Sequence, residues 1–336
     1  MPATIRDLAR HCGLSVSAVS KALNGYSDVS DETRRAVMEA ARELDYHPNA
    51  HARALKAGRS YNLGVLFSDD SQSGLLHPFF SVVLESFKKE AEASGYDITF
   101  ISHRMGSGRL TCLDHCRYRE VDGVCVACID FEEDEVRRLI ESDLPLVTID
   151  HDFDGRACVQ SDNGGGMRQL VEYVYGLGHR QVGYIHGPHS AATDARLTAF
   201  EETSRRLGLV QMTGYVDQAE YTNPQSVYEA AKRMLALPLR PTCILVCDDF
   251  SATGALRAAQ EMGLKVPRDL SVAGYDGIAQ MQAFSPRLTT VYQDAPQMGR
   301  EAARLLISLG EGNGAPVINS VPTRLIRGET VSRIQF

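Results

Sequence analysis

The chain has 336 residues, of which 43% are hydrophobic and 23% charged, a composition typical of a soluble globular protein with two or three domains. The net charge of −8 excludes a uniformly basic coat for nucleic acid, and no apolar run approaches the ~20 residues of a membrane span. Charge is uneven, because residues 1–60 carry nine Lys and Arg against seven Asp and Glu. Any contact with DNA is therefore expected in this N-terminal head.

Residues 4–25 predict two short helices that cross through a tight turn. Apolar residues recur at helical spacing before and after the turn: Ile5, Leu8, Ala9 and Cys12, then Val19 and Leu23. Gly13 relieves the turn of a Cβ clash, and Ser15 can cap the second helix. Thr4 and Asp7 form a near capping box for the first helix. This pattern indicates a helix-turn-helix, the alternative being an ordinary pair of core helices.

A third helix and a linker follow. Ser30 can cap a helix that ends near Tyr46, so the head is expected to span residues 1–47. Residues 48–60 form the predicted hinge, in which the stretch 49–56 has helix formers but only about two turns. We expect this stretch to become helical only on binding DNA, the alternative being a plain surface linker.

From residue 61 onward, short apolar runs alternate with amphipathic stretches. The predicted strands are 63–67, 97–101, 123–127, 146–150, 182–186, 243–247, 270–274 and 288–292. The predicted helices include 79–93, 164–176, 225–236, 251–262 and 295–309. Continuous apolar strands alternating with helices predict a doubly wound α/β core with parallel sheets. This number of strands is larger than one compact sheet holds. We therefore expect two lobes with a cleft between them.

Polar residues follow several of these strands, where ligands bind in such sheets. They are Ser68, Asp69 and Asp70 after the first strand, Asp150 and His151 after the fourth, and Asp248, Asp249 and Asp276 later in the chain. Carboxylates suit hydroxyl-rich ligands because they accept hydrogen bonds, and Phe79 and Phe80 offer an apolar platform. Capping of the next helix is the alternative role for each aspartate, above all for Asp249.

Other motifs point away from metal or catalytic chemistry. Cys125 and Cys128 form a CxxC within an expected buried strand, so no metal site is predicted there. The glycine cluster 162–166 lacks the Lys and Ser/Thr of a phosphate-binding loop. No nucleophile elbow or zinc-protease motif occurs, so the chain is not expected to be an enzyme and no cofactor is predicted. The N-terminus lacks a signal peptide's apolar segment, which predicts a cytoplasmic protein.

Taken in order, several motifs resemble the lactose and galactose repressor family (LacI type). They include TIRDLARHCGLSVSAVSKALNG (4–25), HPFF (77–80), GLGHRQVGYIHGP (176–188), CDDFSATGAL (247–256) and SVAGYDG (271–277). The resemblance implies a helix-turn-helix head joined to a core like the periplasmic sugar-binding proteins. It also implies a homodimer that reads a near-palindromic operator as a repressor, controlled by a small effector, with a sugar expected.

The family pattern places DNA contacts on the second helix and the hinge. Base readout falls on Val16, Ser17 and Lys21, and the minor-groove wedge falls on Leu55. The full expected set is Thr4, Ser15, Val16, Ser17, Ala18, Ser20, Lys21, Asn24, Arg53, Leu55 and Lys56.

The resemblance also implies an effector site between two lobes of the core, 61–336. The lobes are expected at about 61–160 with 291–320, and about 161–290 with 321–336. Expected effector-binding residues are Ser68, Phe79, Phe80, Asp150, Asp162, Arg196, Asp248 and Asp276. The chain departs from the family pattern at Ala295, where a bulky residue is common, and at Asp248, where Asn is common.

Two other classes of function compete with this hypothesis. A solute-binding transport protein shares the expected core, but the DNA-binding head argues against it. A hydrolase using the acidic cleft lacks any supporting acid–base motif. Control of the regulator by a partner protein stays open.

Overall fold

The computed structural model describes residues 3–23, 26, 28–47, 58–68, 74–102, 104–105 and 108–334. Contacts between residues divide the chain into two compact units, Met1–Tyr61 and Asn62–Phe336. Within the described ranges, no helix is long and apolar enough to cross a membrane. The predicted hinge falls almost wholly outside these ranges, because only its last three residues, 58–60, are described.

The first unit contains three helices, α1 (Ile5–Cys12), α2 (Val16–Leu23) and α3 (Asp31–Glu43). The capping box of α1 is confirmed, since the Thr4 and Asp7 side chains each accept a hydrogen bond from the other residue's backbone N–H. Gly13 ends α1 with a positive φ of 63°, which a residue with a Cβ adopts at a cost. Each helix contributes to one small core: Leu8, Ala9, Val19, Ala22, Val37, Ala40 and Ala41. The three-helix head follows from this pattern of apolar spacing.

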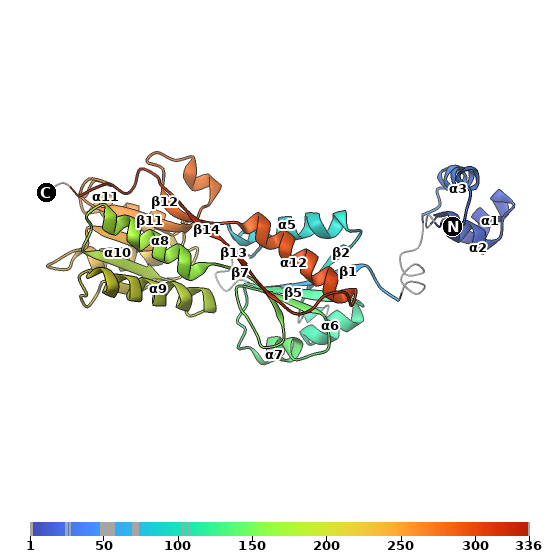
Figure 1. Ribbon diagram of the computed structural model, residues 1–336, viewed down its shortest axis with the longest axis horizontal. Coiled ribbons are helices and arrows are strands. Elements are labelled where there is room, and N and C mark those ends of the chain that lie inside the picture. The colour runs from blue at the N-terminus through green and yellow to red at the C-terminus, as the bar shows by residue number, and fades with distance from the viewer. Residues whose placement is uncertain are drawn as a thin grey trace. The chain divides into compact units, whose positions relative to one another are not determined.

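The second unit contains two sheets, which we call the N-lobe and C-lobe sheets. The N-lobe sheet is fully parallel in the order β13-β7-β6-β5-β1-β2. Its strands are β1 (Asn62–Phe67), β2 (Asp97–Ile101), β5 (Gly123–Ala127), β6 (Leu146–Ile149), β7 (Ala157–Ser161) and β13 (Ile318–Val321). Two helices cover each face, α5 (Phe80–Ala93) with α12 (Ala295–Gly310), and α6 (Cys112–Tyr118) with α7 (Asp134–Ile140) (Figure 1). A short turn of helix, η1 (Gly74–Leu76), and the pair β3 (Arg104–Met105) and β4 (Gly108–Arg109) complete this lobe.

The C-lobe sheet has the order β14-β12-β11-β10-β8-β9. Its strands are β8 (Val182–His186), β9 (Val216–Gln218), β10 (Cys243–Val246), β11 (Ser271–Asp276), β12 (Thr289–Gln293) and β14 (Thr323–Ile326). Its helices are α8 (Asn163–Gly176), α9 (Ala191–Leu207), α10 (Pro224–Leu235) and α11 (Ala252–Glu261), with a short turn, η2 (Ala279–Gln282). The expectation of a parallel sheet is confirmed for the other strand pairs of this sheet, and the edge strand β14 departs from it by running antiparallel to β12. The reason is that β14 enters the C-lobe at the edge where β12 leaves it, so that Gln293 pairs with Thr323.

The chain crosses between the lobes three times. The crossings lie between β7 and α8, between β12 and α12, and between β13 and β14. Residues at these crossings therefore contact both lobes. In parallel α/β sheets ligands bind beyond the carboxyl ends of the strands, which is the edge from which the first two crossings depart.

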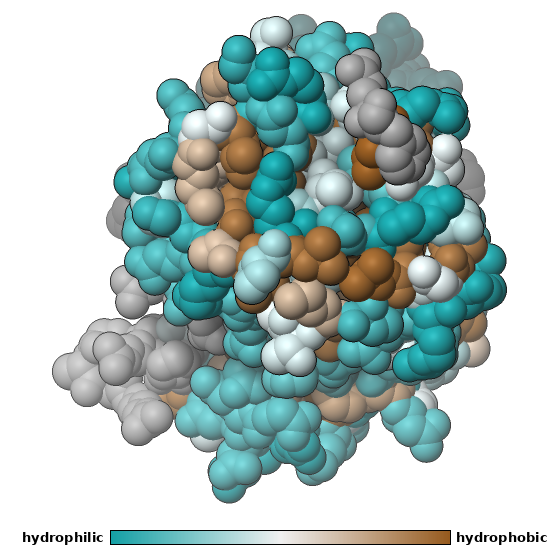
Figure 2. Space-filling model, turned by 90° about the vertical axis from the view of Figure 1, so that its left-hand side faces the viewer, coloured by the Kyte–Doolittle hydropathy of each residue, from teal (hydrophilic) through white to brown (hydrophobic). Residues whose placement is uncertain are grey.

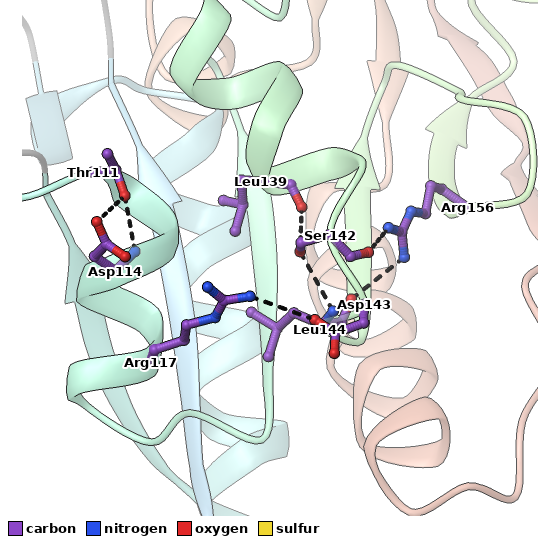
Figure 3. A network of polar contacts seen from close by, with 8 residues as sticks. All are labelled: Thr111, Asp114, Arg117, Leu139, Ser142, Asp143, Leu144 and Arg156. Carbon is purple, nitrogen blue, oxygen red and sulfur yellow. Dashed lines mark hydrogen bonds and ion pairs between the residues drawn. The ribbon is translucent and has the colours of Figure 1, made fainter.

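The N-lobe is fixed on its outer side by polar contacts around the link from α7 to β6 (Figure 3). The guanidinium of Arg156 donates to the carbonyl oxygens of Leu144, at 3.4 Å, and Ser142. Arg117 on α6 lies 3.9 Å from Asp143 in the same link. A donor fork of this kind satisfies carbonyl groups of a loop that have no partner in a helix or sheet. This network therefore supports the N-lobe sheet but lies outside the predicted effector site.

Candidate functional site

The second helix of the head presents a polar and a buried side. Val19 and Ala22 are buried in the head core, whereas Val16 is 43% exposed and Ser17 is exposed. Val16 is a large apolar residue at the first position of α2 with no core to fill. An exposed first turn is what a recognition helix needs in order to reach base edges in the major groove.

The other predicted residues of α2 have local partners. The Ser15 hydroxyl accepts a hydrogen bond from the Ala18 N–H at 3.1 Å, so that it caps α2. The Lys21 ammonium pairs with the carboxylate of Asp28. Lys21 therefore has to leave or share this partner in order to contact DNA. Exposed pairs of this kind contribute little to stability, so the exchange costs little.

The remaining predicted DNA contacts divide into two groups. Thr4 caps α1, and Ala18 and Ser20 are half-buried on α2. Four predicted contacts lie outside the described residues: Asn24, Arg53, Leu55 and Lys56.

A cavity of about 160 Å³ lies at the crossing from β7 to α8. Asp150, Ser161 and Ser320 line it from the N-lobe, and Asp162, Asn163 and the first turn of α9 line it from the C-lobe. This interlobe cavity is lined largely by polar groups, and of the predicted effector-binding residues it contains Asp150 and Asp162.

Asn163 joins the two lobes within this cleft. Its Nδ2 donates to Asp150 Oδ1 at 3.3 Å, and its Oδ1 accepts a hydrogen bond from Arg196 Nε at 2.7 Å. Asp150 Oδ1 also accepts from the Ser161 N–H at 2.8 Å. One buried amide thus connects an N-lobe carboxylate with a C-lobe guanidinium.

Arg196, on α9, is buried to 4% exposure beneath the cleft. Its Nη1 donates to the Cys247 carbonyl oxygen at 3.2 Å, and its guanidinium carbon lies 3.7 Å from the centre of the Tyr275 ring. Within the described part of the chain, no carboxylate oxygen lies within the 4.0 Å that defines an ion pair. The guanidinium thus has an aromatic face and neutral partners, and keeps donor capacity for a polar ligand.

Asp276 stands at the end of β11 in an unusual backbone conformation. Its φ of 106° lies in a region that side-chain-bearing residues rarely adopt, and such strain is typical of functional sites. Asp276 Oδ1 accepts a hydrogen bond from Gln293 Nε2 at 2.7 Å. Burial raises the pKa of Asp276 to about 8, with Arg196 opposing this shift and Asp248 adding to it. Asp276, Arg196 and Asp248 therefore form one electrostatic group.

The structure corrects the assignment of capping roles among the predicted aspartates. Asp248 Oδ1 accepts the Ser251 N–H at 2.7 Å just before α11, and its Oδ2 accepts the Thr222 N–H at 3.1 Å. Asp162 accepts the Gly165 N–H at 2.9 Å and caps α8. Asp249, the residue expected above all to cap, instead contacts the segment after β11. Neighbouring positions in a loop point in different directions, which the sequence pattern does not reveal.

The expected aromatic platform is largely covered. Phe79 is only 7% exposed, and its ring packs edge-on against Phe80 with centroids 5.2 Å apart. Phe80 also contacts Phe67 and His77, so these rings form an aromatic group of the N-lobe. Ser68 follows β1 and is exposed, directly before residues 69–73, which include Asp69 and Asp70 and lie outside the described residues.

Three polar residues near the predicted site were not predicted: Asn163, which lines the cavity, and Tyr275 and Gln293, which bind Asn163 and Asp276 by hydrogen bonds. Each lies at the end or start of an element that borders the cleft, as the predicted aspartates do. The same signal, a polar residue at the end of a strand or the start of a helix, finds these residues if it is applied to amide side chains and tyrosine as well as to aspartate.

No group of three or more His, Cys, Asp or Glu side chains within the described ranges can hold a metal ion. Burial raises the pKa of Cys125 to about 12 and that of Cys112 to about 11. These thiols are therefore poor nucleophiles and poor metal ligands.

A second hollow, of about 270 Å³, lies at the amino ends of the C-lobe strands, away from the cleft. Arg240, Arg268 and Arg333 line it, and Arg268 binds the Asp269 carboxylate at 2.9 Å. This hollow contains none of the predicted effector-binding residues.

Figure 2 looks onto the C-lobe end of the molecule, a mostly hydrophilic face crossed by a band of apolar side chains.

Comparisons with known proteins agree with this geometry. Residues 4–49 match the bacterial regulatory proteins of the lacI family, and residues 171–331 match the periplasmic binding protein-like domain. The HTH-type transcriptional repressor PurR of Edwardsiella ictaluri is 32% identical over 311 residues, covering 91% of this chain and 89% of the relative. The PurR repressor of Escherichia coli O139:H28 is 33% identical over 316 residues, with the same two coverages.

Solved structures show the same architecture over the whole chain. The lac repressor dimer bound to operator and the anti-inducer ONPF superposes with a TM-score of 0.84 at 27% identity, covering 99% of this chain and 100% of the other. The complex of the transcriptional regulator CelR with cellobiose has a TM-score of 0.71 at 26% identity, covering 98% and 99%.

Proposed function

Because this chain belongs to the lacI family of bacterial regulatory proteins, we propose that it is a repressor that binds a near-palindromic operator as a homodimer. Residues 1–47 are proposed as the DNA-binding domain, 48–60 as the hinge and 61–336 as the effector-binding core. The proposed location is the cytoplasm, because a repressor must reach the chromosome there. The family consists of transcriptional repressors rather than enzymes.

One observation carries the DNA-binding part of the proposal. The first turn of α2 exposes Val16 and Ser17 while Val19 and Ala22 hold the helix on the head core. Val16 suits the methyl group of thymine, Ser17 suits several base edges, and Lys21 suits the acceptors of guanine. The hinge residues Arg53, Leu55 and Lys56 are proposed to add phosphate contacts and a minor-groove wedge.

The chemistry of the cleft supports a polyhydroxylated effector, and we propose a sugar. Arg196 offers hydrogen-bond donors, Asp150 and Asp276 offer acceptors, and Asn163 and Gln293 offer both. The CelR relative was solved with cellobiose. The two lobes are joined at three crossings. A ligand that binds both lobes at once shifts the protein between open and closed arrangements of the lobes.

Large exposed apolar side chains support the proposed homodimer. In the N-lobe, Leu76 is 84% exposed and Phe100 is 50% exposed, while in the C-lobe Phe284 is 65% and Phe250 43% exposed. Such side chains mark an interaction surface where they form a contiguous patch. The solved lac repressor relative is a dimer. Leu76→Asp and Phe284→Asp are proposed to shift the protein towards monomers in sedimentation velocity experiments.

The test of the DNA-binding proposal is selection of binding sites from random duplex DNA by the full-length protein. Enrichment of a sequence with two-fold symmetry supports the proposal, and enrichment of no sequence contradicts it. A panel of mono- and disaccharides, with nitrogenous bases as the comparison class, is then screened for release of the selected DNA. A response to bases alone would contradict the assignment of a sugar.

A further inference from the structure

The loop that carries Asp276 is held by a buried pair on neighbouring elements. Asp249 follows β10 and Thr290 belongs to β12, so the two residues flank β11 in the sheet. Both are fully buried, at 0% exposure. Neither can therefore contact an effector directly from the surface of the cleft.

The two side chains bind consecutive N–H groups directly after Asp276. The Ile278 N–H donates to Asp249 Oδ2 at 2.7 Å, and the Gly277 N–H donates to Thr290 Oγ1 at 3.3 Å. The Thr290 hydroxyl donates in turn to Asp249 Oδ1 at 2.5 Å. This arrangement closes a ring of hydrogen bonds around the turn.

Two glycines leave the space that this ring requires. A Cβ on Gly274 would lie 2.3 Å from Asp249 Oδ1, so only glycine admits the carboxylate against β11. Gly277 has a φ of 73°, and a Cβ there would meet the Cα of Tyr292 at 2.8 Å. The turn therefore packs closely against β12, where a side chain at Gly277 would clash.

Burying Asp249 is costly in itself. In the part of the chain that the structure describes, no cation lies within ion-pair distance of its carboxylate. Burial, together with the nearby Asp276, raises the pKa of Asp249 well above its usual range. A buried carboxyl group without a nearby cation depends on its hydrogen bonds for stabilisation. The hydrogen bonds of Asp249 go to the Ile278 N–H of the turn and to the Thr290 hydroxyl.

We propose that Asp249 and Thr290 are positioning residues that hold the turn 276–278 so that Asp276 keeps its strained backbone and its carboxyl group keeps its place beside Gln293. Because Asp276 is assigned to the effector site only under the proposed function, the value of this positioning for effector binding rests on that function. The positioning itself does not, since it concerns the backbone of the turn. The strained φ of 106° at Asp276 is the feature that the pair has to maintain.

The test is amide hydrogen exchange of the full-length protein without any ligand, using Thr290→Val, Thr290→Ser and Thr289→Val. Thr289 is the matched control, since it is the neighbouring buried threonine but accepts a hydrogen bond from the Gly328 N–H at 3.1 Å. We expect Thr290→Val to speed exchange at residues 277–278 by about fivefold or more, as loss of a hydrogen bond of typical strength does. Thr290→Ser restores protection, and Thr289→Val acts near Gly328 only.

Asp249→Ala and Asp249→Asn form the second pair. Asn keeps an acceptor for the Ile278 N–H and a polar partner for Thr290, so Asp249→Asn should retain protection of 277–278 that Asp249→Ala loses. Unchanged exchange at 277–278 in both Asp249→Ala and Thr290→Val would overturn the proposal. Uniformly faster exchange throughout the C-lobe would overturn it as well, because that outcome means a general loss of stability. If the turn loosens as expected but Asp276→Ala leaves sugar responses intact, the proposed effector site is wrong while the positioning role stands.

Discussion

The Arg196 side chain donates from Nε to Oδ1 of Asn163 over 2.7 Å, and this single bond links a guanidinium of α9 to the crossing between the lobes. Asn163 also reaches Asp150 of the N-lobe, and its backbone carbonyl accepts the Tyr275 hydroxyl at 3.0 Å. The residue thus occupies the point where the N-lobe sheet, α8 and α9 meet. A ligand that displaces any one of these bonds changes the connection between the lobes.

We expect Asn163→Ala to lower the free energy of unfolding by ~1–3 kcal/mol, because it leaves the buried Arg196 Nε without its partner. It should also weaken the response of DNA binding to the effector. Denaturant unfolding and DNA release measure the two effects. Gln160→Ala is the control, since Gln160 lines the same cavity with the same class of side chain. Equal effects of the two substitutions would show that the hydrogen bonds of Asn163 contribute no more to stability and effector response than the side chain of Gln160 does.

Val16→Ala and Lys21→Ala should change which bases are preferred while leaving the affinity for the effector unchanged, because the head and the core are separate compact units. Each lost base contact is expected to weaken the discrimination between bases at its position. Binding-site selection with each variant gives the preferences. Arg35→Ala removes an exposed charge from α3 and serves as the control. A wild-type consensus from both α2 variants would show that the recognition helix is misplaced.

Asp28→Asn should strengthen DNA binding, because it frees the Lys21 ammonium from its ion pair and removes a negative charge near the phosphates. The slope of log K against log salt should become steeper by up to about one unit if one more phosphate is neutralised. Fluorescence anisotropy across a salt series provides both values. Asp31→Asn, which removes the partner of Arg34 on α3, is the matched control. An unchanged slope with unchanged affinity would argue against a phosphate or base contact by Lys21.

Asp276→Asn should flatten the pH dependence of stability. The pKa of Asp276 is raised in the folded protein to about 8, so the folded state binds more protons than the unfolded state between the two pKa values. Stability from this group is therefore greatest at low pH and is lost as the pH rises towards 8, by up to about 1.4 kcal/mol per pH unit. Asn keeps an acceptor for Gln293 but cannot ionise.

The measurement is the free energy of unfolding of wild type and Asp276→Asn from pH 5 to pH 8. Their difference should grow in favour of the variant as the pH rises. Asp97→Asn, at an exposed position of the N-lobe, is the control for the loss of one carboxyl group. Parallel curves for wild type and Asp276→Asn would show that Asp276 does not hold a proton in the folded core.

The sequence determined those parts of the protein where local chemistry is sufficient. The Thr4–Asp7 cap, Gly13 and the apolar spacing predict the helix-turn-helix, and continuous apolar runs predict strands such as 123–127 within their observed bounds. The helix α9 was missed because its buried face includes Thr193, Arg196 and Ser204, which hide the apolar period. The edge strands β9 and β14 were not predicted because they lack a continuous apolar run.

Only the tertiary structure decided what each polar residue of the cleft does. Sequence placed Asp248, Asp249 and Asp276 at strand ends, but folding turned Asp248 towards α11, Asp249 towards the turn after β11, and Asp276 towards Gln293. This partner of Asp248 is only 3 residues away, within a local capping pattern, whereas Asp249 and Asp276 bind partners 29 and 17 residues away, which no local pattern encodes. The joining role of Asn163 likewise arises because Asp150 and Arg196 reach it from separate lobes, a juxtaposition that exists only after both sheets have formed.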